Sequence, residues 1–199
     1  MSQTDLGDAL PPPERSDELR RRLAMRRSAP AQALIAPGPS EAELNEILTI
    51  GARTPDHGKL FPWRFVLLGP KSRAEIAERL AVLAERRDRP AKDQAALAKL
   101  TAAPVSILVI SAPVPRAKPV WEQQLSAGAV CMNLEHAANA FGYSASWITD
   151  WYSYDPDGAA LFGVREGEAI AGFIHIGSLA EPPLERPRPD MAAKVTRRP

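Results

Sequence analysis

Residues 121–141 read WEQQLSAGAVCMNLEHAANAF and contain no proline and a single glycine. This composition predicts the longest helix of the chain, at the centre of the fold, with Gly142 closing its C-terminal end. The first half is rich in alanine, serine and glycine, and such small residues let another backbone or a flat ring come close. Tight helix packing explains the same residues, so composition alone leaves both interpretations open.

Strands and helices alternate on both sides of this helix. Residues 105–111 form a short β-branched run between prolines, which predicts a buried strand. Further strands are predicted at residues 64–68, 145–149 and 169–177, and further helices at residues 71–86, 90–100 and 155–162.

Two more helices are predicted near the N-terminus from their capping residues. Ser16 is expected to cap a helix that runs to about Arg27, with acidic residues in its first turn. Ser40 and Glu43 have the spacing of a capping box for a second helix, which ends near Gly51.

Length and charge limit the classes of function. The 199 residues carry 25 basic and 24 acidic side chains, so no strong field draws nucleic acid or an anionic membrane to the whole surface. The longest apolar run is too short to span a bilayer, and the polar N-terminus does not resemble a secretory signal. We therefore expect a cytoplasmic protein with a weakly ordered tail, residues 1–15, and a single domain, residues 16–199.

Neither a metal centre nor a nucleophile motif is predicted. The one cysteine, Cys131, cannot form an intrachain disulfide and is expected to be a small buried side chain. The histidines lack the spacing of a metal site: His175 is predicted to be half-buried on a strand, and His136 to form a surface or interface pair with Glu135. The sequence also has no glycine-rich dinucleotide turn, no P-loop and no catalytic serine elbow.

Arg26, Arg27 and Ser28 stand at the end of the first predicted helix and form a candidate phosphate site. Two guanidinium groups and a hydroxyl suit a phosphate dianion, because arginine forms bidentate charge-assisted hydrogen bonds to phosphate oxygens. Cations are also favoured at any helix C-terminus, so a solvated helix end is the alternative.

The loop of residues 52–62 joins a helix to a strand and contains Arg53 and His57, with Trp63 directly after it. Loops that carry such groups often serve function. The alternative is a structural turn in which Asp56 caps its own backbone and Trp63 packs in the core.

Trp147, Ile148 and Thr149 stand at the end of a predicted strand and are followed by Asp150 and Trp151. Ligands commonly bind at the ends of strands in sheets covered by helices. Buried aromatic side chains and an aspartate N-cap explain the same residues without a ligand.

Taken together and in this order, these motifs resemble the nitroreductase family, in particular its short bacterial branch of NAD(P)H nitroreductases. Five pieces between about residues 17 and 190 carry the resemblance: Arg26-Arg-Ser-Ala29, Arg53-Thr-Pro-Asp-His57 with Pro62-Trp63, Trp121-Glu-Gln-Gln-Leu-Ser-Ala-Gly128, Trp147-Ile-Thr149 and Gly172-Phe-Ile-His-Ile-Gly177. The resemblance implies an α+β sandwich, with a mainly antiparallel central sheet flanked by helices. It also implies an intertwined homodimer with the long helix at its interface and two FMN sites made by both chains.

The resemblance assigns the first FMN-binding residues. Arg26, Arg27 and Ser28 match the motif that opens the FMN site, where Arg26 and Ser28 would hold the phosphate and ribityl end. Arg53 and His57 match positions that reach FMN from the partner chain.

Further FMN-binding roles fall on the second half of the chain. Trp147, Ile148 and Thr149 match the strand end that lies along the flavin. Arg188, or else Arg186, resembles a late basic residue that many members place on the phosphate.

The chain departs from the family pattern after Trp147. Ile148 and Thr149 stand where the related branch tends to have arginine and then serine, and Asp150 stands where glycine is common. An arginine missing near the flavin could change the flavin's potential or its substrate preference. The negative charge of Asp150 could repel acidic substrates.

The implied activity is FMN-dependent, NAD(P)H-driven reduction of small electron-poor substrates, nitroaromatics or quinones. The donor reduces the flavin and leaves before the acceptor binds the same face, a ping-pong scheme in which no side chain must act as acid or base. Residues 137–142 match a segment assigned to nicotinamide nucleotide binding. The alternative is a non-catalytic flavin-binding or flavin-storage protein, which Ile148 and Asp150 would favour.

Overall fold

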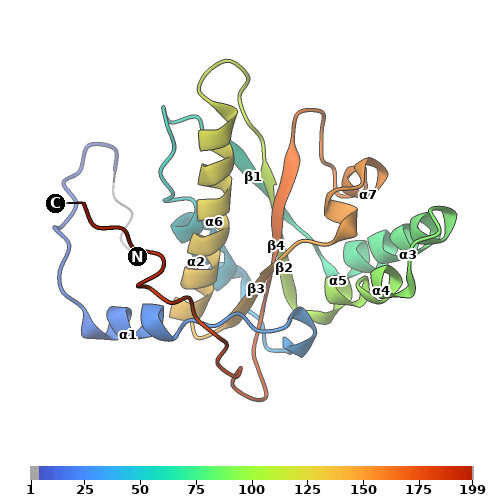
Figure 1. Cartoon of the computed structure of the whole chain (residues 1–199), viewed down its shortest axis with the longest axis horizontal. Coiled ribbons are helices and arrows are strands. Elements are labelled where there is room, and N and C mark those ends of the chain that lie inside the picture. Colours follow the sequence, from blue (N-terminus) through green and yellow to red (C-terminus); the bar gives the residue numbers. More distant parts are fainter. Residues whose placement is uncertain (1–4, 199) are drawn as a thin grey trace.

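The computed structural model describes residues 5–198 and places a four-stranded sheet between two layers of helices (Figure 1). The strand order is β1-β2-β4-β3, and each neighbouring pair is antiparallel. The strands are β1 Trp63–Leu67, β2 Val105–Ser111, β3 Ser144–Ile148 and β4 Ala169–Gly177. The predicted α+β class with a mainly antiparallel central sheet is confirmed.

The helices divide between the two faces of the sheet. One face is covered by α2 Glu41–Gly51 and by the long helix, α6 Val120–Ala140. The other face carries α3 Pro70–Arg86, α4 Ala91–Ala95, α5 Ala98–Ala102 and α7 Pro156–Ala160 (Figure 1). Two short 3-10 helices, η1 Ala31–Ala33 and η2 Trp151–Ser153, were not predicted.

Alternating side chains of the strands build one core on each face. On β2, Ile107 and Val109 face α2 and α6, whereas Leu108 and Ile110 belong to the core under α3 and α5. This is the period of two expected of a strand. Because both faces are covered, all four side chains are fully buried.

The predicted caps of the N-terminal helices are present. The Oγ of Ser16 accepts a hydrogen bond from the Leu19 N–H at the start of α1, Asp17–Met25. Ser40 and Glu43 form both halves of the capping box of α2. Helix α1 has no buried residue and lies beside the C-terminal end of α6 (Figure 1).

One predicted helix, residues 90–100, is wrong as a single element, because the structure divides it into α4 and α5. The indole Nε1 of Trp151 donates a 3.0 Å hydrogen bond to the carbonyl oxygen of Asp93. In a continuous helix that oxygen would accept from Leu97 N–H, which instead bonds to Gln94. A tertiary contact thus interrupts the helix.

The prediction that His175 is half-buried is also wrong, because its side chain is fully buried. Its Nδ1 lies 2.7 Å from the Oγ of Ser106, which also accepts a hydrogen bond from the guanidinium of Arg73. The Arg73 charge on this hydroxyl and the burial of the ring both favour the neutral imidazole. Burial, with the nearby Arg73 charge, lowers the pKa of His175 to about 4.

The ends of the chain add little to the core. Residues 5–15 are exposed and contain neither helix nor strand, while residues 1–4 of the predicted tail lie outside the described residues. Within residues 5–198, no helix has both the length and the apolar character needed to cross a membrane.

Candidate functional site

The segment Arg26–Ser28 is held against α6 by one buried carboxylate, that of Glu135. Arg26 Nη1 lies 3.2 Å from Glu135 Oε2 and 3.1 Å from Ser28 Oγ. Ser28 Oγ in turn donates to Glu135 Oε1 at 3.1 Å. The Trp147 N–H donates to the same carboxylate oxygen at 3.2 Å. Glu135 therefore brings the Arg26–Ser28 and the Trp147–Thr149 motifs into contact.

The electrostatic state of Glu135 follows from its burial. Its side chain is almost completely buried, and this raises the pKa of the carboxyl, while Arg26, Ser28 and the Trp147 N–H act to lower it. Desolvation of a carboxylate is costly, so the ionised form depends on these donors. The predicted surface or interface pairing of Glu135 with His136 is wrong, because Glu135 turns inward to Arg26.

The C-terminal segment returns to the same place. Arg27 Nε donates to the Leu184 carbonyl oxygen at 3.1 Å, and Arg188 Nη2 to the Arg26 carbonyl oxygen at 3.3 Å. Arg188 also forms a 2.8 Å ion pair with Glu185. Three guanidinium groups, those of Arg26, Arg27 and Arg188, thus gather around one short stretch of backbone.

Trp147 lies flat against β4. Its indole Nε1 donates a 3.0 Å hydrogen bond to the Ala171 carbonyl oxygen. A Cβ atom at Gly172 would lie 2.0 Å from this nitrogen, so only glycine allows the indole to rest there. Trp147 is still 38% exposed, which leaves part of the ring open to solvent.

The next residues of this motif behave differently. The side chain of Ile148 packs into the core under α3 and α5. On the face of the sheet that carries the Trp147 side chain, Ile148 therefore presents only its backbone. Thr149 Oγ1 lies 2.8 Å from the Tyr154 hydroxyl. Asp150 caps η2 and forms a 2.8 Å ion pair with Lys99; its charge is therefore compensated.

The loop motif lies along a different side of α6. Asn133 donates a 2.7 Å hydrogen bond to Thr54 Oγ1, and Ser126 a 2.9 Å bond to the Pro55 carbonyl oxygen. His57 Nδ1 lies 2.6 Å from Glu122 Oε2 near the start of the helix. Arg53 is exposed and takes part in none of the ion pairs found within residues 5–198.

The loop and the Arg26 segment therefore do not meet within one chain. Because successive helical residues are rotated by about 100°, Ser126 and Asn133 share one side of α6 and Glu135 lies on the opposite side. The solvent-facing strip between them carries Trp121, 67% exposed, and Leu125, 54% exposed. The two motifs border this apolar strip from opposite sides.

A hollow of about 250 Å³ adjoins the arginine cluster. Arg26 and Arg27 line it together with Asn139, Gly142 and Tyr143. Asn139 and Gly142 belong to residues 137–142, which close α6. The hollow thus links this segment to the arginine cluster.

Several of these partners were not predicted as site residues. Glu122, Glu135 and Glu185 each contact a predicted residue, and of the three only Glu135 is buried. A signal exists only for Glu135, as the one acidic residue of α6 after Glu122. Cys131 is buried as predicted, and burial raises the pKa of its thiol to about 12.

Comparisons with known proteins agree on one family. The model of the "Nitroreductase family" matches residues 23–178. "Putative NAD(P)H nitroreductase YdjA" of Escherichia coli K12 is 32% identical over 161 residues, which cover 78% of this chain and 85% of the relative. A "Putative NAD(P)H nitroreductase" of Haemophilus influenzae is 32% identical over 155 residues, with coverage of 73% and 80%.

Solved structures show the same fold. A nitroreductase-like family protein from Bacillus cereus superposes with a TM-score of 0.76 at 23% identity, over 94% of this chain and 98% of the other. A nitroreductase from Desulfovibrio desulfuricans, solved in complex with FMN, has a TM-score of 0.73 at 19% identity, with coverage of 93% and 99%.

Proposed function

The chain belongs to the nitroreductase family, and on that premise we propose that it is an FMN-dependent NAD(P)H oxidoreductase. It acts as a homodimer and reduces small electron-poor acceptors, nitroaromatics or quinones. The observation that carries the proposal is the convergence of Arg26, Ser28 and Arg188 beside Trp147, around the buried carboxylate of Glu135.

The residues at this place fit an FMN phosphate. Arg26 uses Nη1 for Ser28 and Glu135, and its Nε and Nη2 donate in none of the hydrogen bonds found within the described residues. Arg27 adds a further cation within the same stretch, and Arg188 adds a guanidinium whose charge is shared with Glu185. A phosphate dianion takes several charge-assisted hydrogen bonds of this kind. Arg26, Arg27, Ser28 and Arg188 would hold the phosphate end.

The flavin ring would lie along the end of β3. Trp147 offers a partly open aromatic face, and Ile148 and Thr149 offer backbone groups on that strand end. When bound, FMN supplies the electron transfer between NAD(P)H and the acceptor. The chain's own residues bind and orient the partners, and no side chain need act as an acid or base.

A second copy of the chain completes the site. The exposed strip of α6 is apolar at Trp121 and Leu125 and contains small residues, which favours close packing of another protein surface. Because the loop with Arg53 and His57 borders this strip, a second copy seated there brings its loop to the interface. We place the flavin between the Arg26 segment of one chain and Arg53 and His57 of the partner subunit.

The visible spectrum of the purified protein tests the cofactor assignment. The proposal expects a yellow protein whose released chromophore co-elutes with FMN on chromatography, at about one per chain. A colourless protein that also fails to take up added FMN contradicts it.

Reduction under anaerobic conditions separates the enzyme from a flavin-storage protein. The proposal expects NADH or NADPH to bleach the flavin absorbance, and a nitroaromatic or quinone to restore it. Ile148 and Asp150 are the residues that favour the storage alternative. The side chain of Ile148 turns into the core and Asp150 is paired with Lys99, so neither argues strongly against turnover. A bound flavin that neither donor bleaches would favour storage.

A further inference from the structure

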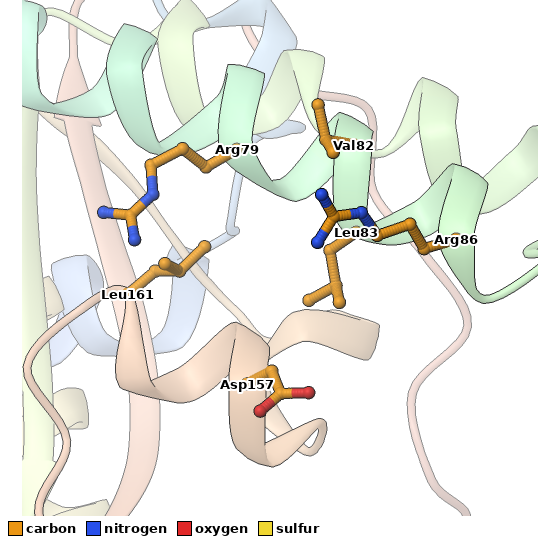
Figure 2. A pocket seen from close by; sticks show the side chains of 6 residues that line it. All are labelled: Arg79, Val82, Leu83, Arg86, Asp157 and Leu161. Carbon is orange, nitrogen blue, oxygen red and sulfur yellow. The ribbon is translucent and has the colours of Figure 1, made fainter.

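A second hollow, of about 300 Å³, lies between α3 and α7 (Figure 2). We propose that it binds a small organic anion with an apolar body, such as a medium-chain carboxylate. Its lining residues are Arg79, Val82, Leu83, Arg86, Asp157 and Leu161. These elements cover the sheet face opposite α6, so the hollow is separate from the proposed flavin site.

The wall of the hollow is apolar where a hydrocarbon body would lie. Val82 and Leu83 of α3 and Leu161 after α7 contribute it, and Val82 remains 47% exposed. Figure 2 shows Leu83 and Leu161 pointing into the space between the two helices. Covering these side chains removes apolar surface from water, which favours an occupant with an apolar body.

Two arginines supply positive charge at the edge of this wall. The positions three or four residues from Arg86 hold Val82, Leu83, Arg89 and Pro90, so helical spacing gives it no acidic partner. Among residues 5–198 it forms no ion pair. Its guanidinium is therefore available to a ligand.

Arg79 is free for a different reason. Glu75 stands four residues before it, at the spacing of a helical ion pair, but Glu75 lies 3.9 Å from Lys71 instead. Figure 2 shows the guanidinium of Arg79 extended toward Leu161. Both arginines thus frame the apolar wall with uncompensated charge.

The one acidic residue of the lining does not cancel this charge. Asp157 is ion-paired with Arg87, which lies outside the lining. The hollow therefore combines net positive charge with an apolar wall. Its volume lies at the lower end of small-molecule pockets, which favours a compact ligand.

Calorimetric titration of the full-length protein tests the proposal with three probes. Octanoate has both the anionic head and the apolar body, whereas acetate has only the head and octanol only the body. We expect saturable binding of octanoate, and binding at least about tenfold weaker for the other two. Absence of saturable octanoate binding overturns the proposal. Binding of an acidic peptide in its place would not rescue it.

Variants locate the binding. Arg79→Ala and Arg86→Ala each remove an exposed cation, so the fold is retained and octanoate affinity should fall about fivefold. Lys92→Ala on the neighbouring helix α4 is the matched control, because Lys92 is exposed and lies outside the lining, and it should leave the affinity unchanged. Equal effects of all three variants, or none from either arginine, overturn the assignment.

A last titration separates this hollow from the flavin site. With excess FMN present, octanoate should bind with the same affinity. Competition between FMN and octanoate would place the ligand in the flavin site and overturn the proposal, whether or not the proposed oxidoreductase function holds.

Discussion

The guanidinium of Arg26 and the carboxylate of Glu135 form a 3.2 Å ion pair that joins the end of α1 to the second half of α6. The same carboxylate accepts hydrogen bonds from the Ser28 hydroxyl and the Trp147 N–H. A single buried side chain thus fixes the relative position of two motifs that the proposed flavin site requires.

Removal of this carboxylate should be costly. Glu135→Ala leaves a partly buried guanidinium without its counter-charge and two donors unpaired, so we expect a loss of about 3 kcal/mol in the free energy of unfolding. Glu135→Gln keeps acceptors for Ser28 and Trp147 and should lose less. Urea unfolding at matched protein concentrations compares the two, and equal stability of both variants would contradict this role.

Arg26→Ala should weaken FMN retention. The variant removes a charge-assisted hydrogen bond to the phosphate, and the dissociation constant should rise about tenfold to a hundredfold. Arg20→Ala is the control, because within residues 5–198 Arg20 pairs only with the exposed Asp17. Fluorescence titration of flavin-free protein with FMN measures both, and unchanged affinity in Arg26→Ala would rule out the phosphate assignment.

Local structure was largely predictable because its causes are local. The capping box of Ser40 and Glu43 and the strand of residues 105–111 depend on neighbours in sequence. The division of residues 90–100 does not, because it depends on Trp151, far along the chain. His175 is buried because helices cover both faces of the sheet, which an alternating pattern does not reveal.

The candidate site shows the same limit. Arg26, Ser28 and Trp147 were predicted from motifs, but the residue that joins them, Glu135, lies 107 positions from Ser28. Nothing near Glu135 in sequence indicates its partners. Tertiary contacts of this kind follow only from the fold.

Gly172→Ala should displace Trp147. The new Cβ would lie 2.0 Å from the indole nitrogen, so the ring must leave β4, at a cost of about 1–3 kcal/mol in stability. Gly128→Ala is the comparison on the other side of the same ring: its Cβ would be 3.8 Å from the indole, an ordinary contact. We expect only Gly172→Ala to lower the urea midpoint and to shift tryptophan emission; equal behaviour of both would show that the indole is not confined.

His175 should make stability depend on pH. Its pKa is lowered from 6.5 to about 4 in the folded chain, so between these values the unfolded state binds more protons. The contribution is therefore complete above pH 6.5 and is lost as pH falls toward 4, by up to about 3 kcal/mol. Urea unfolding can be measured in buffers from about pH 7.5 to about pH 4.5, roughly one pH unit apart. Over this range the free energy of unfolding should fall more steeply for the wild type than for His175→Gln. Parallel curves would contradict the buried neutral imidazole.

Leu125→Arg should disrupt the dimer and, with it, flavin retention. Leu125 is 54% exposed in the single chain and lies on the strip of α6 where we place the second copy, so an arginine there would have to be desolvated on association. Val82→Arg on α3 is the control, because Val82 is similarly exposed but lies on the opposite face of the sheet. Sedimentation should show half the mass for Leu125→Arg alone, with a lower ratio of flavin to protein absorbance although the Arg26 segment is intact. A Leu125→Arg protein that stays dimeric and keeps its flavin would show that the site does not depend on this strip.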